Sequence, residues 1–221
     1  MFGYVAYRAP EMPPVRVIEG ARFRAVYVLP GNTLRARLSA RAAARALARE
    51  SVQAAVFPPE YLHRELFARY GIAAPPLVPL YRATAAAIVR RHLAQSEIEP
   101  RRASVAFAAE SVTPELRRAI FALAADVRYI ALAIPHGGDA LAQALRRKLG
   151  VAARVGPFEM LPSADLVVAF DETECDALRL DETLRVVYDS PYPNELLAAL
   201  WRAGAINADA LCVKNVTRDP A

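Results

Sequence analysis

Polar residues that could bind a ligand or take part in chemistry stand directly after several short apolar runs of this 221-residue chain. These ligand-binding candidates are Glu110, His136, Gly137, Gly138, Asp171 and Asp189. Carboxylates in such positions could hold a divalent cation or act as acid and base, and a histidine could contact a ligand or donate a proton. Acidic residues are also common as caps and turn formers, so the same pattern fits a structural role. The sequence assigns no catalytic residue and no metal ligand.

The turn Pro135-His-Gly-Gly-Asp139 is the most suggestive of these places. Two glycines at the start of a helix would expose backbone N–H groups, which is the geometry of an anion site. However, Asp139 fits the N-cap of the helix and would compete with an anion. A tight strand-to-helix turn therefore explains the same residues, and both interpretations stay open.

The apolar runs that precede these residues predict the strands of one parallel sheet. We expect strands at 103–109, 128–134, 151–155, 165–170 and 184–188, with helices at 113–125 and 139–149 between them. Runs that are apolar throughout are typical of strands covered on both faces. The fold class expected is α/β and Rossmann-like, mostly parallel with helices on both faces. Because the carboxyl ends of parallel strands share one edge, the candidate residues should lie along that edge.

The N-terminal part predicts a smaller α/β unit. Residues 1–19 are rich in proline and are expected to form an irregular arm. Strands follow at 23–29 and 52–57, with helices at 34–49, 60–70 and, after a proline-rich loop, 80–94. The loop at 73–79 divides the chain into residues 1–79 and a linking helix with the Rossmann-like domain, 80–221, in which a further helix covers 195–202. One continuous domain is the alternative.

The order of elements over 80–190 resembles Rossmann-like dinucleotide-binding domains that follow a smaller α/β domain, as in shikimate dehydrogenase and methylenetetrahydrofolate dehydrogenase. The resemblance implies a Gly-x-Gly-x-x-Gly turn after the first strand, but this chain has Ala108-Ala-Glu-Ser-Val-Thr-Pro114 there. Without these glycines the backbone cannot approach a pyrophosphate closely, and Glu110 would repel a phosphate. We therefore expect no bound cofactor.

Charge and composition limit the kinds of partner that we expect this chain to bind. Residues 1–150 carry 22 basic and 11 acidic residues, and the rest carry 6 and 12, within a net charge of +5. No nucleic-acid-binding motif accompanies the basic part, so nucleic acid is an unexpected partner. No apolar run has the roughly 18 residues that a membrane span needs. The N-terminus lacks the features of a signal peptide, so a cytoplasmic protein is the default expectation.

The sequence therefore favours a non-catalytic partner-binding or scaffolding module with a degenerate nucleotide-binding turn. The alternative is a small-ligand enzyme or binding protein that takes a phosphorylated metabolite or nucleotide in the crevice at the strand ends. A deep pocket containing His136 would favour the alternative, and a filled crevice would favour the module. Whether the chain is an enzyme, which small molecule or protein is its partner, and its oligomeric state stay open.

Overall fold

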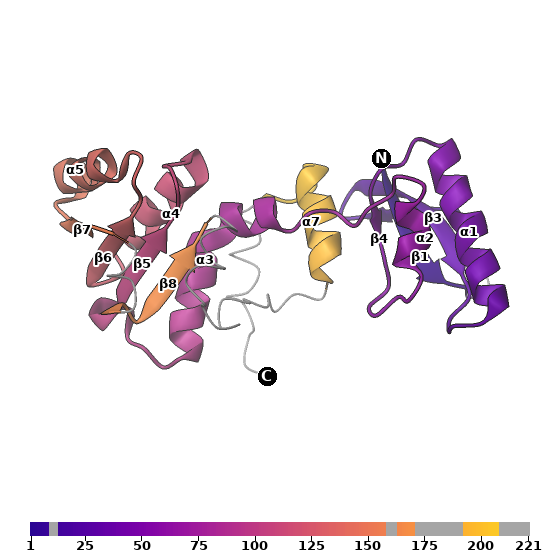
Figure 1. Ribbon diagram of the computed structural model, residues 1–221, viewed down its shortest axis with the longest axis horizontal. Helices are drawn as coiled ribbons and strands as arrows, with labels where there is room; N and C mark the ends of the chain where they lie inside the picture. Colours follow the sequence, from indigo (N-terminus) through magenta and orange to yellow (C-terminus); the bar gives the residue numbers. More distant parts are fainter. Residues whose placement is uncertain (9–12, 158–162, 171–191, 208–221) are drawn as a thin grey trace. The chain divides into compact units, whose positions relative to one another are not determined.

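The computed structural model describes residues 1–8, 13–157, 163–170 and 192–207. The chain divides into two compact units, one of Met1–Leu80 with Asp189–Ala221 and one of Tyr81–Tyr188. The described part of each unit contains a four-stranded, mostly parallel sheet flanked by helices (Figure 1). The α/β class expected from the sequence is therefore confirmed.

The first sheet has the order β2-β3-β1-β4. Its strands are β1 (Phe2–Tyr7), β2 (Val15–Ile18), β3 (Ala21–Val28) and β4 (Ala55–Val56). β1 is parallel to both β3 and β4, and β2 is antiparallel to β3. A two-residue turn, Glu19-Gly20 with φ of 48° and 83°, joins β2 to β3, as expected for a tight hairpin. The expectation of an irregular arm at 1–19 is wrong, since aromatic and β-branched residues make its first part the strand beside both β3 and β4.

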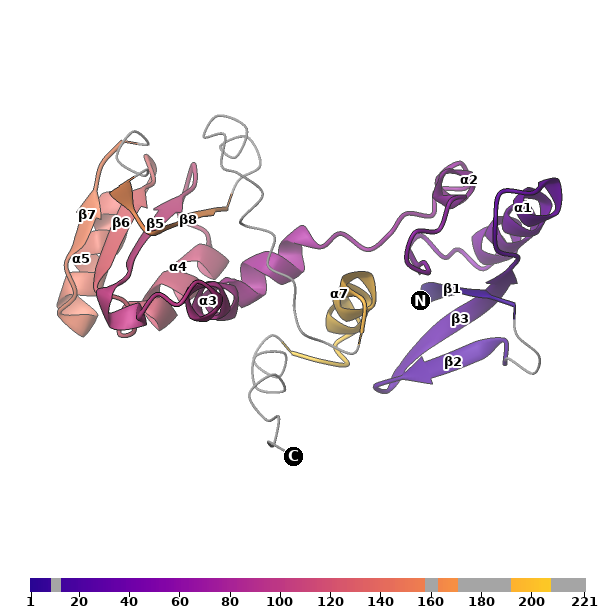
Figure 2. The same cartoon turned by 90° about the horizontal axis from the view of Figure 1, so that it is seen from below.

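Helices cover both faces of this first sheet. α1 (Leu34–Arg49) has the predicted bounds, and the Thr33 side chain caps it by accepting a hydrogen bond from the Ala36 N–H at 3.2 Å. α1 and the short α2 (Arg64–Ala68) lie on the same side of the sheet (Figure 2) and pack against Val5 and Val26. The predicted helix 60–70 is thus confirmed only in its central part, and the strand 52–57 only at Ala55–Val56.

The opposite face of the first sheet is covered by α7 (Asn194–Arg202), a helix that is far away in the sequence. Leu196 and Leu200 pack there with Phe23 and Val56 in one buried cluster. The sequence groups this helix with residues 80–221, because its leucine spacing shows which side is buried but not what covers it. Its partner is set by tertiary packing.

The second sheet has the order β7-β6-β5-β8, and its strands are parallel throughout. They are β5 (Ser104–Ala108), β6 (Tyr129–Ala133), β7 (Ala153–Val155) and β8 (Leu166–Ala169). Four of the five predicted strands are confirmed, together with their parallel direction. The fifth, 184–188, lies outside the described residues.

Three helices pack on one face of the second sheet: α3 (Val78–Gln95), α4 (Pro114–Leu123) and α5 (Gly138–Leu149). The large strand residues, such as Phe107 and Leu132, point to this face. The other face carries small side chains, among them Ala106, Ala108 and Ala133. No helix of the described residues contributes to this alanine cluster, so the helices seen in this unit lie on one face.

Candidate functional site

Glu110 and His136, two of the predicted site residues, come together at the carboxyl edge of the second sheet. Ser111 forms a parallel bridge with His136 beyond the ends of β5 and β6. The His136 N–H donates to the Glu110 carbonyl oxygen, and the Val112 N–H donates to the His136 carbonyl oxygen, both at 3.2 Å. The loop after β5 therefore continues to pair with its neighbour. These backbone N–H groups are used inside the loop and are not directed at a ligand.

One of the two glycines of the predicted anion turn has a structural reason. Gly137 adopts φ of +92° as the N-cap residue of α5, and a Cβ there would lie 3.2 Å from Cγ2 of Val112. Gly138 is buried, but a Cβ there would make only ordinary contacts with Ile134 and Val155, at 3.4 and 3.5 Å. Asp139 lies in the first turn of α5, so its expected role as N-cap is wrong. A left-handed N-cap favours glycine, which explains this correction.

The other two candidates, Asp171 and Asp189, lie outside the described residues. A residue that sequence reasoning missed stands at the neighbouring strand end: the Arg82 Nε–H donates to the Phe170 carbonyl oxygen at 2.9 Å, just after β8. Within the described residues, no three His, Cys, Asp or Glu side chains gather in a way that could hold a metal ion. The helices there also include none that is long and apolar enough to cross a membrane.

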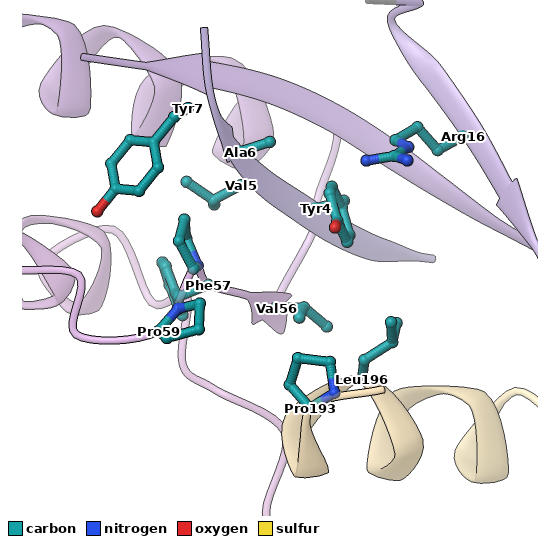
Figure 3. A pocket seen from close by; sticks show the side chains of 11 residues that line it. Tyr4, Val5, Ala6, Tyr7, Arg16, Val56, Phe57, Pro59, Pro193 and Leu196 are labelled. Atoms are coloured by element: carbon teal, nitrogen blue, oxygen red, sulfur yellow. The ribbon is translucent and has the colours of Figure 1, made fainter. Parts of the chain in front are cut away.

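The first unit contains a cavity of about 310 Å³ at the carboxyl ends of β1 and β4. β4 pairs only with Gly3 and Tyr4, whereas β1 continues to Tyr7. On the β4 side of β1, the last residues of β1 therefore have no strand partner among the described residues. Figure 3 shows the side chains around this opening. The lining consists of Tyr4, Val5, Ala6, Tyr7, Arg16, Val56, Phe57, Pro58, Pro59, Pro193 and Leu196.

One wall of the cavity is held in place by Glu195 in the first turn of α7. Its Oε2 accepts a hydrogen bond from the Phe57 N–H at 3.3 Å, directly after β4. Its Oε1 pairs with Nη1 of Arg64 at 2.8 Å, and the Arg64 guanidinium lies 5.6 Å from the centre of the Phe57 ring. Glu195 therefore ties α7 to the segment after β4 and has its charge matched by Arg64.

A second wall is built from aromatic rings. Phe57 stacks on Tyr61, with ring centres 6.0 Å apart and planes 10° apart, and Tyr7 meets Tyr61 edge-on at 6.2 Å. Tyr61 is buried, and its hydroxyl has no hydrogen-bond partner in the described part of the chain. Burial, with a smaller contribution from Tyr7, raises the pKa of Tyr61 to about 12. His63 is also buried beside Tyr61, and its Nε2 lies 3.0 Å from the Gly31 carbonyl oxygen.

The cation of the cavity is Arg16. Its guanidinium carbon lies 4.7 Å from the centre of the Tyr4 ring, at a distance typical of a cation–π contact. Arg16 is on β2 and Tyr4 is on β1, so the side chain reaches across β3, where Tyr4 is opposite the small Ala25. Among the described residues the guanidinium has no hydrogen-bond or ion-pair partner, in contrast to Arg24, which pairs with Glu50 at 2.8 Å.

This cavity was not predicted from the sequence. Tyr4, Tyr7 and Arg16 fall within the segment interpreted as an arm, although Phe2-Gly-Tyr-Val-Ala-Tyr7 is rich in strand-forming residues. A second, more open hollow of about 380 Å³ lies over α4 and α5, lined by Pro114, Arg117, Arg118, Phe121 and Lys148. Neither cavity is lined by Glu110 or His136.

Comparisons of the chain with protein-family models, curated proteins and solved structures find no match. The site must therefore be interpreted from its own geometry.

Proposed function

We propose that this protein is a non-catalytic binding module that takes a small ligand in the cavity of its first unit. The observation that carries the proposal is the cavity itself, about 310 Å³ at the carboxyl ends of two parallel strands. Ligands of open α/β sheets bind outside the carboxyl ends of the strands. The volume lies at the lower end of the roughly 300–1,000 Å³ of small-molecule sites, so the ligand is a compact molecule.

The lining supports binding rather than turnover. Among the described residues that line it, Tyr4, Tyr7 and Arg16 are polar, and the other eight are apolar. A nucleophile with an adjacent base, or a pair of carboxylates, is the usual requirement for hydrolytic and group-transfer chemistry. The lining residues that the structure describes include neither, whereas a mostly apolar wall with a few polar groups is typical of a recognition site.

The second unit supports a non-catalytic role. Its strand order β7-β6-β5-β8 follows the 3-2-1-4 part of the Rossmann strand order, which favours a Rossmann-like assignment. The turn that would hold a pyrophosphate instead pairs its backbone with the loop after β6. A unit whose turn is closed in this way lacks the usual pyrophosphate site of the fold. Cytoplasmic localisation is part of the same proposal.

A second candidate, an enzyme that uses the edge of the second sheet, has one observation in its favour. Glu110 and His136 are neighbours there and both are exposed, so a carboxylate and an imidazole share one edge. Arg82 adds a cation at the end of β8. This candidate predicts that a ligand protects residues around 110 and 136 from hydrogen exchange, whereas the proposed function predicts protection in the first unit.

The proposed function is tested by a thermal-shift screen of nucleotides, sugar phosphates, aromatic acids and divalent metals. A ligand at 100 times its Kd should stabilise the protein by about 2.7 kcal/mol. Hydrogen–deuterium exchange with the best compound should then show protection of the backbone amides within 4–7 and 56–59, where Pro58 and Pro59 carry no N–H. In Ala6→Leu, whose larger side chain enters the cavity, binding should be lost, and in the control Ala42→Leu, on the exposed side of α1, it should be unchanged.

Two results would overturn the proposed function. One is a stabilising ligand that protects the second unit and leaves residues 4–7 and 56–59 unprotected. The other is a screen in which no compound class stabilises the wild-type protein. The exchange measurement uses the wild-type chain, so it decides the question even where Ala6→Leu fails to fold.

A further inference from the structure

We infer that the ligand of this cavity is a compact aromatic carboxylate, whose anion pairs with Arg16 and whose ring lies among Tyr4, Tyr7 and Phe57. This inference rests on the proposed function and names its ligand class. It is drawn from the charge of the lining, from the geometry of Arg16 and from the shape of the walls.

The charge of the lining matches one negative charge. Among the described residues of the lining, Arg16 is the single formally charged one, and none is a carboxylate. The nearby Glu195 is already paired with Arg64 and with the Phe57 N–H. In a mostly apolar cavity, a monoanion leaves no charge unmatched, whereas the second charge of a phosphate dianion would have no partner, which is costly. A neutral ligand would leave the guanidinium without an ionic partner.

The geometry of Arg16 suits a carboxylate. A guanidinium is planar, and its N–H groups match the two oxygens of a carboxylate in a bidentate pair. The contact with Tyr4 at 4.7 Å holds the guanidinium against one ring and leaves its N–H donors without protein acceptors among the described residues. An anionic ligand would accept hydrogen bonds from these N–H donors and would neutralise the positive charge of the guanidinium.

The walls suit a flat ring next to the carboxylate. Figure 3 places Tyr7, Phe57 and Pro59 toward one end of the cavity and Arg16 toward the other, with Tyr4 between them. Phe57 is held in its orientation by the stack on Tyr61 and by an edge contact with Phe67 at 5.1 Å. Aromatic pairs contribute binding energy beyond that of the area that they bury. A ligand with the anion at one end and a ring at the other therefore meets matching groups at both.

The test compares benzoate and indole-3-carboxylate with their neutral amides and with phenyl phosphate, by calorimetric titration of the full chain. We expect the carboxylates to bind at least tenfold more tightly than the amides. Arg16→Gln should weaken carboxylate binding at least tenfold and leave amide binding unchanged, and Arg16→Lys should have an intermediate effect. Arg22→Gln is the matched control, since Arg22 is exposed on the same hairpin and does not line the cavity.

The outcomes separate this inference from the proposed function. If amides bind as tightly as carboxylates, or if Arg16→Gln and Arg22→Gln weaken the carboxylates equally, the ligand class is wrong and the cavity remains a binding site. Tighter binding of phenyl phosphate, or protection of the cavity only by a non-aromatic compound, would overturn the ligand class in the same way. If no compound protects residues 4–7 and 56–59, the proposed function fails as well. Unchanged amide binding also shows that Arg16→Gln is folded.

Discussion

The hydroxyl of Tyr61 is the group whose removal should stabilise this protein. The residue is 5% exposed, and its hydroxyl has no hydrogen-bond partner among the residues that the structure describes. A buried polar group without a partner costs about 1–3 kcal/mol in lost hydration. Tyr61→Phe keeps the ring contacts with Phe57, Phe67 and Tyr7 and removes only the oxygen. Because the small void left behind has a cost of its own, we expect a gain of about 1 kcal/mol in the free energy of unfolding.

The gain should increase at alkaline pH. Burial raises the pKa of Tyr61 from 10.0 to about 12, so the folded protein keeps this proton after the unfolded chain has released it. Below pH 10 both states keep the proton and the stability is at its full value, and between pH 10 and 12 the stability falls because only the unfolded chain releases the proton. With about 1.36 kcal/mol for each pKa unit, the wild-type protein should lose about 1.4 kcal/mol at pH 11 through this group. Tyr61→Phe lacks this loss, so its advantage should grow to roughly 2–2.5 kcal/mol.

Urea unfolding at pH 8 and pH 11 measures both effects, with the fluorescence of Trp201 as the reporter. Trp201 is the one tryptophan of the chain and lies on α7, in the first unit. The control is Tyr70→Phe. The exposed hydroxyl of Tyr70 accepts a hydrogen bond from the Arg45 Nε–H at 3.0 Å, and its removal should lower the free energy of unfolding by about 0.5 kcal/mol or less. A loss of stability in Tyr61→Phe at pH 8, or an advantage that is the same at both pH values, would refute the reasoning.

Two further predictions concern the second unit. Gly137→Ala should destabilise it by about 1–2 kcal/mol in urea unfolding followed by circular dichroism, because φ is +92° and the new Cβ would lie 3.2 Å from Val112. Gly150→Ala, at φ of +70° with open space around it, should lower the free energy of unfolding by less than Gly137→Ala does. An equal decrease in the two variants would mean that the contact with Val112 has no cost. Titration of NADH or NADPH should show no saturable binding at low micromolar concentration, because the backbone after β5 is already paired. A saturable signal in that range would contradict this.

The second sheet was predictable because each of its strands carries its own signal. The segments at 103–109 and 128–134 are apolar nearly throughout, and helices separate the strands, so a parallel sheet follows from local patterns. The same logic placed Glu110 and His136 at one edge, as the bridge beside them confirms. α1 was predictable from its length and its cap at Thr33.

The first sheet and its cavity were harder to predict, since their signals are short or distant. β4 has two residues, and nothing in the local sequence distinguishes it from the rest of 52–57. The prolines after Tyr7 favour an irregular segment over the whole of 1–19, so the strand that precedes them was not predicted. The cavity combines Tyr4, Arg16, Phe57 and Leu196, which meet only through strand order and through the packing of α7. Patterns along the chain cannot show such long-range contacts.

The first unit is discontinuous in the chain, and this has a consequence for its synthesis. Leu196 and Leu200, which cover Phe23 and Val56, are made after the whole of Tyr81–Tyr188. At about 5–20 residues per second, one face of the first sheet stays open to water or to a chaperone for roughly 5–20 s while the second unit is translated. Pro193, which helps to close the cavity, also arrives last. A ligand that needs the closed cavity would therefore bind only finished chains and would favour them over truncated ones.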